Sequence, residues 1–252
     1  MTLNTVAIIQ ARMTSNRLPG KVLMEVAGCP MLLQEVHRLE RSKRISEIVI
    51  ATTTNGTDDP IVSLAQQTGV RCFRGSENDV LGRYAGAARA VKADVVVRLT
   101  ADCPLIDAEV MDDVIFALIN RPSKYDYASN VLQRTYPRGL DVEALFCDTL
   151  FRIERLADST QDREHVTTFL RSSHPELFLT CSVEDNQNNA DLRWTVDTQK
   201  DFELVCRIYE GMHLGDSNAL YREVLAFVRE HPKIAQLNSE IKTWDPKKDN
   251  SS

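Results

Sequence analysis

Sequence patterns typical of strands and of amphipathic helices alternate along the first half of the chain. Apolar runs such as residues 6–9 and 95–97 have the length of buried strands. The segments between them repeat apolar residues at helical spacing, which in residues 79–92 places Val80 and Tyr84 on one face. Because such alternation is typical of βαβ units, the sequence predicts an α/β fold with a mainly parallel central sheet and helices on both faces. The predicted strands are residues 5–10, 47–52, 70–73 and 94–99, and the predicted helices are residues 31–41, 60–68, 79–92 and 109–119, the last capped by Asp107.

The pattern changes in the second half of the chain. Two strand-like stretches, residues 125–129 and 140–146, enclose an irregular segment, so we expect residues 125–146 to form a small antiparallel arm that contacts a partner. We expect a single domain over residues 3–244, followed by a disordered tail over residues 245–252, which lack apolar side chains. The remaining predicted helices are residues 148–157, 163–173, 199–209 and 218–229, and the remaining strands are residues 178–183 and 192–196.

Composition excludes several classes of protein. The 252 residues are enough to bury a full core, and the apolar runs are too short for a membrane span. A net charge of -6 argues against a general binder of nucleic acid or of anionic membranes, because such proteins carry a broad basic face. The six cysteines form no CxxC pair and the first residues carry no secretion signal, so we expect reduced thiols in a cytoplasmic protein.

A loop after the first predicted strand holds three cations and no acid. It contains Arg12, Arg17 and Lys21, and the first acidic residue of the chain is Glu25. This local positive field favours a bound phosphate, since open α/β sheets bind ligands at the carboxyl ends of their strands. The loop is not a P-loop, because Val22 stands where Ser or Thr must follow the lysine. Taken singly, each cation also fits the role of a solvated loop residue.

Two aspartates stand where predicted strands end. Asp102 follows the strand at residues 94–99, and Asp197 follows the strand at residues 192–196. A carboxylate in such a place is a ligand that Mg²⁺ accepts together with substrate phosphates. The structural alternatives are an Asx-turn before Pro104 for Asp102 and a helix N-cap for Asp197. Either alternative is compatible with metal binding.

The cationic loop resembles a motif of the sugar-acid cytidylyltransferases, the family that includes the Kdo and acylneuraminate enzymes. In that family an A-R-x-x-S-x-R-L-P-G-K loop wraps a nucleoside triphosphate, and residues 11–21 match its fixed positions. The segments T-A-D-C-P-L-I-D and T-V-D-T are similar to those that carry the two metal-binding aspartates of the family, matched here by Asp102 and Asp197.

Three further segments resemble a narrower branch, the spore coat polysaccharide biosynthesis F-type cytidylyltransferases. They are residues 75–81, 136–143 and 163–167, and the whole similarity extends over about residues 6–203. Gly82 and Asn16 depart from the branch, which often has Asp and Ser at these positions.

The resemblance implies a GT-A-like, Rossmann-like nucleotidyltransferase fold, CTP as the donor and a homodimer. It also implies Mg²⁺, with Mn²⁺ as a substitute, held by Asp102 and Asp197, so that catalysis by Arg12, Lys21 and Asp102 is mostly positioning and electrostatics. The nucleotide-binding positions that it implies are Gln10, Ala11, Arg12, Lys21, Gly75, Ser76, Asp79 and Ala101.

The expected reaction transfers CMP from CTP to a small acidic acceptor, a sugar acid or a phosphorylated metabolite, and releases pyrophosphate. We expect it to serve surface polysaccharide synthesis. The sequence does not determine which acceptor is used. Arg134, Arg138, Arg163 and His165 are candidate acceptor-binding residues because they can bind a carboxylate or a phosphate, although His165 also fits a structural role in an apolar helix. Two alternatives remain: a GT-A-type glycosyltransferase, which normally needs a D-x-D-like pair, and a non-catalytic nucleotide-binding protein.

Overall fold

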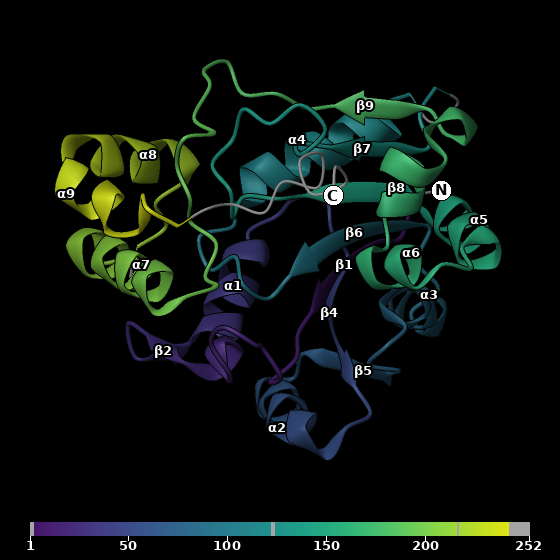
Figure 1. Cartoon of the computed structure of the whole chain (residues 1–252), viewed down its shortest axis with the longest axis horizontal. Helices are drawn as coiled ribbons and strands as arrows, with labels where there is room; N and C mark the ends of the chain where they lie inside the picture. Colours follow the sequence, from purple (N-terminus) through teal and green to yellow (C-terminus); the bar gives the residue numbers. More distant parts are fainter. Residues whose placement is uncertain (1–2, 122–123, 216, 242–252) are drawn as a thin grey trace.

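A seven-stranded sheet forms the centre of the molecule in the computed structural model, which describes residues 3–121, 124–215 and 217–241 (Figure 1). The strands lie in the order β5-β4-β1-β6-β8-β7-β9, and every neighbouring pair is parallel except the two pairs made by β8. The predicted α/β fold with a mainly parallel sheet is therefore confirmed. The sheet consists of β1 (Thr5–Gln10), β4 (Glu47–Thr53), β5 (Arg71–Gly75), β6 (Val95–Thr100), β7 (Tyr127–Ser129), β8 (Glu143–Phe146) and β9 (Thr180–Ser182), and a small antiparallel pair is formed by β2 (Glu25–Val26) and β3 (Cys29–Pro30).

Helices cover both faces of the sheet because successive strand residues point to opposite sides. Ala7 and Ile9 of β1 pack with α1 (Met31–Leu39), α2 (Asp59–Thr68) and α4 (Ala108–Ile119). Val6 and Ile8 pack on the other face with α3 (Val80–Ala90) and α5 (Cys147–Leu156). Asp107 caps α4 as predicted, since its carboxylate accepts from the N–H groups of Glu109 and Val110.

A third apolar cluster forms at one side of the sheet, where α7 (Gln199–Met212), α8 (Tyr221–Glu230) and α9 (Pro232–Ala235) group together (Figure 1). It encloses Trp194 and Val196, which are 1% and 0% exposed. The Tyr209 hydroxyl donates to the Pro104 carbonyl at 2.6 Å, so α7 is attached to the loop after β6. The C-terminal helices thus hold the segment before Asp197 against the end of β6. The remaining elements are η1 (Lys21–Leu23), η2 (Gly56–Asp58), α6 (Thr160–His165), η3 (Phe169–Ser173), η4 (Pro175–Leu177) and η5 (Gln236–Asn238).

The segment at residues 125–146 differs from the expected arm. Its strands β7 and β8 do pair antiparallel, but both belong to the central sheet, where β8 also pairs with β6. Tyr127, Ala144 and Leu145 are fully buried. Strands with such side chains on both faces are stabilised inside a sheet covered by helices, which is why the segment does not stand apart.

Two other predicted elements change. Residues 192–196 form no strand in the described chain, only an isolated bridge between Arg138 and Arg193. The helix predicted at residues 163–173 is divided at Val166, whose φ of 54° lies in the left-handed region and ends α6. The predicted tail, residues 245–252, lies outside the described residues, as does the predicted domain end at residue 244. No helix in the described part of the chain is long and apolar enough to cross a bilayer.

Gly139, in the loop between β7 and β8, approaches the main chain of residues 194–195 closely. Its φ is 103°, and a Cβ there would lie 2.5 Å from the Thr195 nitrogen. We expect Gly139→Ala to lower the free energy of unfolding, measured with urea, by about 3 kcal/mol, because strain at positive φ adds to a main-chain clash.

Gly69→Ala is the matched control for this change. Gly69 has a φ of 73° but no atom within 4 Å of the added Cβ, so we expect a loss of only about 1 kcal/mol. Equal losses in the two variants would contradict a special role for the contact with residues 194–195.

Candidate active site

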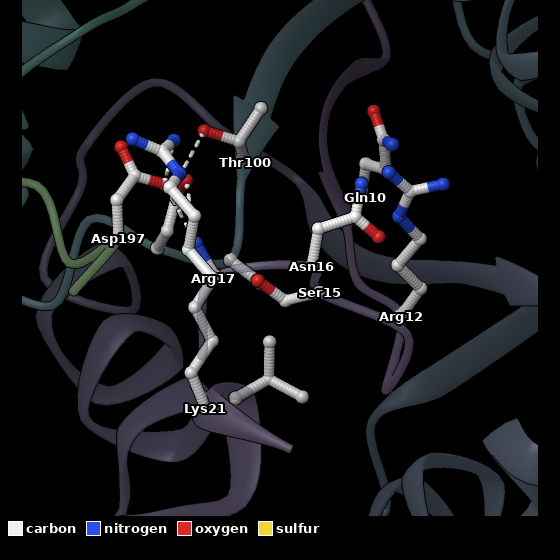
Figure 2. Close-up of a pocket in the computed structure, with 11 residues that line it drawn as sticks. Gln10, Arg12, Ser15, Asn16, Arg17, Lys21, Thr100 and Asp197 are labelled. Atoms are coloured by element: carbon white, nitrogen blue, oxygen red, sulfur yellow. Dashed lines mark hydrogen bonds and ion pairs between the residues drawn. The ribbon is translucent and has the colours of Figure 1, made fainter. Parts of the chain in front are cut away.

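A cavity of about 270 Å³ opens at the carboxyl ends of β1 and β6 (Figure 2). It brings together Arg12, Lys21, Asp102 and Asp197, which the sequence places in three separate segments. In Figure 2, Lys21 and Arg17 reach toward Asp197, whereas Gln10 and Arg12 lie on the opposite side of the view. The full lining is Gln10, Arg12, Ser15, Asn16, Arg17, Lys21, Val22, Thr100, Ala101, Asp102 and Asp197.

The cationic loop folds back on itself before it reaches Lys21. Gly20 adopts a φ of 72°, which suits a residue without a Cβ, and its N–H donates to the Met13 carbonyl at 2.9 Å. The Met13 N–H in turn donates to Asp58 at 2.8 Å, which fixes the loop to the end of β4. Lys21 then starts η1 and is only 8% exposed, so its side chain is directed inward.

The ammonium group of Lys21 connects the two aspartates. Its Nζ lies 3.1 Å from Asp102 Oδ2 and 3.1 Å from Asp197 Oδ1, and it donates to the Val196 carbonyl at 2.6 Å. Burial lowers the pKa of Lys21, but the charges of Asp102 and Asp197 outweigh burial and raise the pKa above its ordinary value. Lys21 therefore stays charged and holds two carboxylates at one point.

The Asp102 carboxylate is held in its ionised form. It accepts a hydrogen bond from the Thr100 hydroxyl at 2.6 Å as well as from Lys21. Burial raises the pKa of Asp102, but the charge of Lys21 and these hydrogen bonds lower it below its usual range. Glu35 of α1, buried nearby, has a pKa raised well above its ordinary value by burial and then by the charge of Asp102. The two acids are therefore shifted in opposite directions, and the charge of Lys21 favours the ionised form of Asp102.

A main-chain hydrogen bond holds the residue before Asp197 next to Asp102: the Val196 N–H donates to the Asp102 carbonyl at 2.8 Å. Asp197 is therefore placed at the cavity. Its carboxylate pairs with Arg17 at 2.9 Å and with Arg193 at 2.6 Å. The N-cap of α7 is Thr198, which forms a capping box with Asp201, so Asp197 does not serve as the cap. Sequence reasoning missed Arg193, although its place four residues before Asp197 was a usable signal.

The two carboxylates suit Mg²⁺ better than a metal for which the protein must supply every ligand. Both Asp102 and Asp197 offer hard oxygen ligands at one point. The described residues contain no cluster of three or more His, Cys, Asp or Glu side chains that could hold a metal. An ion here would take its other ligands from water and from substrate phosphates, as Mg²⁺ commonly does.

A second cavity of about 360 Å³ shares Gln10, Arg12 and Thr100 with the first and extends to Glu77 and Asn78. Glu77 accepts hydrogen bonds from Thr14 at 3.0 Å and from Asn55. Sequence reasoning selected other positions of this loop. The carbonyl groups of Gly75 and Ser76 accept hydrogen bonds within the protein, and Asp79 caps α3. The buried Ala11 donates its N–H to the Ala51 carbonyl. A nucleotide-binding role for these four residues stays a prediction.

A third cavity of about 540 Å³ lies beside the second, and both include Arg98, Thr100 and His165. Three of the four predicted acceptor-binding residues line it, namely Arg134, Arg138 and His165. Arg163 lies elsewhere: its guanidinium pairs with Asp79 and donates to the Glu154 carbonyl at 2.9 Å. Its contacts are those of a residue that joins α6 to α3. Arg98 and Arg171 are further cations of this cavity that sequence reasoning missed.

The fold and the site together are those of a nucleotidyltransferase, with a cationic loop after β1 facing two aspartates. A family model described as cytidylyltransferase matches residues 6–227. The chain therefore belongs to the cytidylyltransferase family.

Individual relatives agree with this assignment. The chain is 38% identical to the spore coat polysaccharide biosynthesis protein SpsF of Bacillus subtilis over 81% of this chain and 85% of that protein. It is 35% identical to a 3-deoxy-manno-octulosonate cytidylyltransferase of Geobacter sulfurreducens over 48% of each chain. The structure of a cytidylyltransferase from Leptospira borgpetersenii superposes with a TM-score of 0.89 at 29% identity, covering 96% of this chain and 100% of that one. The family and branch resemblance seen in the motifs is confirmed.

Removing the Lys21 charge should destabilise the protein in a way that Mg²⁺ reverses. We expect Lys21→Met to lower the free energy of unfolding by about 3 kcal/mol, because two partly buried carboxylates lose the cation that they share. Mg²⁺ without nucleotide should raise the melting temperature of this variant more than that of the wild type. The exposed Lys43, changed to Met, is the control; an equal Mg²⁺ effect in all three proteins would contradict a metal site between the aspartates.

Proposed function

We propose that this protein transfers CMP from CTP to a small acidic acceptor and releases pyrophosphate. The observation that carries the proposal is the meeting of Asp102 and Asp197 at Lys21, in a cavity that also contains Arg12 and Arg17. The names of the relatives, a spore coat polysaccharide protein and a 3-deoxy-manno-octulosonate cytidylyltransferase, support a sugar acid or a phosphorylated metabolite as acceptor and a role in surface polysaccharide synthesis.

In this proposal the triphosphate of CTP occupies the cavity next to the cationic loop. Arg12 is 40% exposed and Arg17 is 58% exposed in their side chains, so both guanidinium groups are available to phosphate oxygens. The nucleoside then lies in the adjoining cavity, where Gln10, Glu77 and Asn78 offer hydrogen-bonding groups. A continuous site at the ends of β1 and β6 thus has room for the whole nucleotide.

The proposed cofactor is Mg²⁺, with Mn²⁺ able to replace it, because Asp102 and Asp197 supply two oxygen ligands beside the phosphate site. When bound, the ion neutralises charge on the phosphate oxygens. Thr100 and Lys21 keep the Asp102 carboxylate ionised and oriented.

The chain's own contribution to the reaction is positioning and charge. An acceptor oxygen attacks the α-phosphorus in line, and the bond from that phosphorus to the bridging oxygen of pyrophosphate breaks. Arg12 and Arg17 stabilise the negative charge that develops on pyrophosphate as it leaves, because their guanidinium groups line the same cavity.

The third cavity suits an anionic acceptor. Its lining contains Arg98, Arg134, Arg138 and Arg171 against two acids, Asp141 and Glu143. This excess of positive charge stands out in a chain whose net charge is -6. Because the cavity shares Thr100 with the nucleotide cavities, an acid bound there lies next to the proposed phosphate site.

The first test replaces the two aspartates with asparagine. Asp102→Asn and Asp197→Asn should each reduce the rate of pyrophosphate release from CTP, assayed with a panel of sugar acids and sugar phosphates, by roughly 10² or more, because each removes one charge from the metal site. Unfolding temperatures should change little. The exposed Asp158, changed to Asn, should keep full activity, and a chelator should abolish the activity of the wild type until Mg²⁺ or Mn²⁺ is returned. Normal turnover by either active-site variant, with normal Mg²⁺ dependence, would refute that residue's role.

The nucleotide preference can be measured without an acceptor. CTP with Mg²⁺ should raise the melting temperature more than ATP, GTP or UTP at equal concentration, since a ligand stabilises the native state in proportion to its affinity. Identical shifts with all four nucleotides would contradict the cytidylyl assignment.

We also propose that the protein acts as a homodimer in the cytoplasm. All six cysteines are free, which fits a reducing compartment. The last strand of the sheet, β9, lies beside Leu177 and Leu179, which are 39% and 60% exposed, and a second copy would cover them. Light scattering should give about twice the 28.4 kDa of one chain, and Leu179→Asp should shift the mass toward that of one chain. A wild-type mass near that of one chain would refute the dimer.

A further inference from the structure

Arg98 occupies the boundary between the nucleotide cavities and the acceptor cavity. It lies in β6 two residues before Thr100, so both side chains are on the same face of the sheet. It lines the cavity that contains Gln10 and Arg12 as well as the cavity that contains Arg134 and Arg138. The Cα atom of Arg98 therefore lies about 7 Å along the strand from that of Thr100, the residue that orients Asp102.

A buried carboxylate fixes the orientation of Arg98. The register of β6 and β8 places Glu143 directly opposite Arg98, and Nη1 of Arg98 donates to Glu143. Glu143 is 4% exposed and also accepts from the Tyr127 hydroxyl at 2.5 Å. Burial raises the pKa of Glu143, but the charges of Arg98 and Arg171 outweigh burial and lower it. The carboxylate thus remains ionised and holds the guanidinium in one position.

Most of the hydrogen-bonding capacity of Arg98 is left over after this pairing. A guanidinium has five N–H groups, whereas its bond to Glu143 uses Nη1, and the buried Nε has no partner among the described residues. The ring of Tyr84, 5.7 Å away, covers one face without supplying an acceptor oxygen. The side chain keeps 17% of its surface exposed. An anion in the cavity can bind the exposed part of this guanidinium and supply acceptors that the described residues do not.

Arg134, another arginine of the cavity, is already engaged. Asp141 binds both of its terminal nitrogens, at 2.6 and 2.8 Å. This bidentate pairing occupies the two terminal nitrogens of Arg134 that would otherwise bind a ligand. Arg98 is paired through one nitrogen alone among the described residues, and it is nearer in sequence and register to Thr100.

We propose that Arg98 is the residue that binds the anionic group of the acceptor, a carboxylate or a phosphate, and so determines acceptor specificity. The proposal rests on the proposed function, because it assigns a role within the same reaction. A fixed guanidinium fork binds two oxygens of a carboxylate or phosphate at once, which a lysine at the same position does not reproduce. Neutral sugars lack this interaction and are excluded as acceptors.

The test measures acceptor binding separately from turnover. Calorimetry in saturating CMP and Mg²⁺ uses three probes: 3-deoxy-manno-octulosonate, a sugar carboxylate; glucose 6-phosphate, a sugar phosphate; and neutral glucose. At least one acid should bind the wild type, and Arg98→Lys should weaken it by roughly 10- to 100-fold, the effect of losing a charge-assisted hydrogen bond. CMP affinity should stay within about twofold, and glucose should bind none of the proteins.

Two further variants separate binding from folding. Arg98→Gln removes the charge but keeps two donors, and should lose as much acid affinity as Arg98→Lys or more. Arg89→Lys changes an arginine that pairs with Glu154 away from the cavities, and should change neither affinity.

Several outcomes would overturn the proposal: no binding of either acid to the wild type, unchanged acid affinity in both Arg98 variants, or an equal loss of acid and CMP affinity, which indicates a structural role. Acid binding that depends on Arg98, without pyrophosphate release for any acid, would refute the proposed function alone. Pyrophosphate release with a KM for the acid that does not depend on Arg98 would refute this proposal alone.

Discussion

The contact of Lys21 with Asp102 and Asp197 is the interaction on which the rest of the site depends. One ammonium group holds together the loop after β1, the end of β6 and the segment before α7. Two carboxylates at such short range repel each other in a low-dielectric environment, so the arrangement requires a cation at their meeting point. Lys21 supplies that charge in the structure. In the proposed function, a divalent ion would supply the same positive charge, which would link the stability of the site to its chemistry.

The cavities of this acidic protein differ in local charge from the chain as a whole. The chain has a net charge of -6, but its cavities concentrate arginines at the carboxyl ends of two central strands. Each cavity shares residues with its neighbour, with Thr100 common to all three. In the proposed function, separate groups of cations would bring a donor phosphate and an acceptor anion to the same sheet edge.

The sequence predicts the sheet and the nucleotide end of the site better than the acceptor end. The strands β1, β4 and β6 are short apolar runs that the local sequence pattern predicts. The loop that holds Arg12 and Lys21 is one continuous segment, so its charges can also be recognised in the sequence. The segment at residues 192–196 has an apolar pattern but forms only one bridge, to Arg138, and the paired segment turns at the next residue, Gly139, whose φ is 103°. The role of Arg98 depends on the register of β6 against β8, and the pairing of Arg163 with Asp79 depends on how α6 packs on α3. Contacts of that kind are set by tertiary packing and have no local signal.

The most direct measurement of the central claim is the binding of Mn²⁺ followed by electron paramagnetic resonance, with CTP present and absent. If Asp102 and Asp197 hold the metal together with nucleotide phosphates, the wild type should bind Mn²⁺ tightly only when CTP is added, at one metal per chain. Asp197→Asn should weaken that binding by about tenfold or more while the protein still binds CTP. Mn²⁺ binding that is the same in the wild type, Asp102→Asn and Asp197→Asn would show that the metal lies elsewhere, and the account of this site would be wrong.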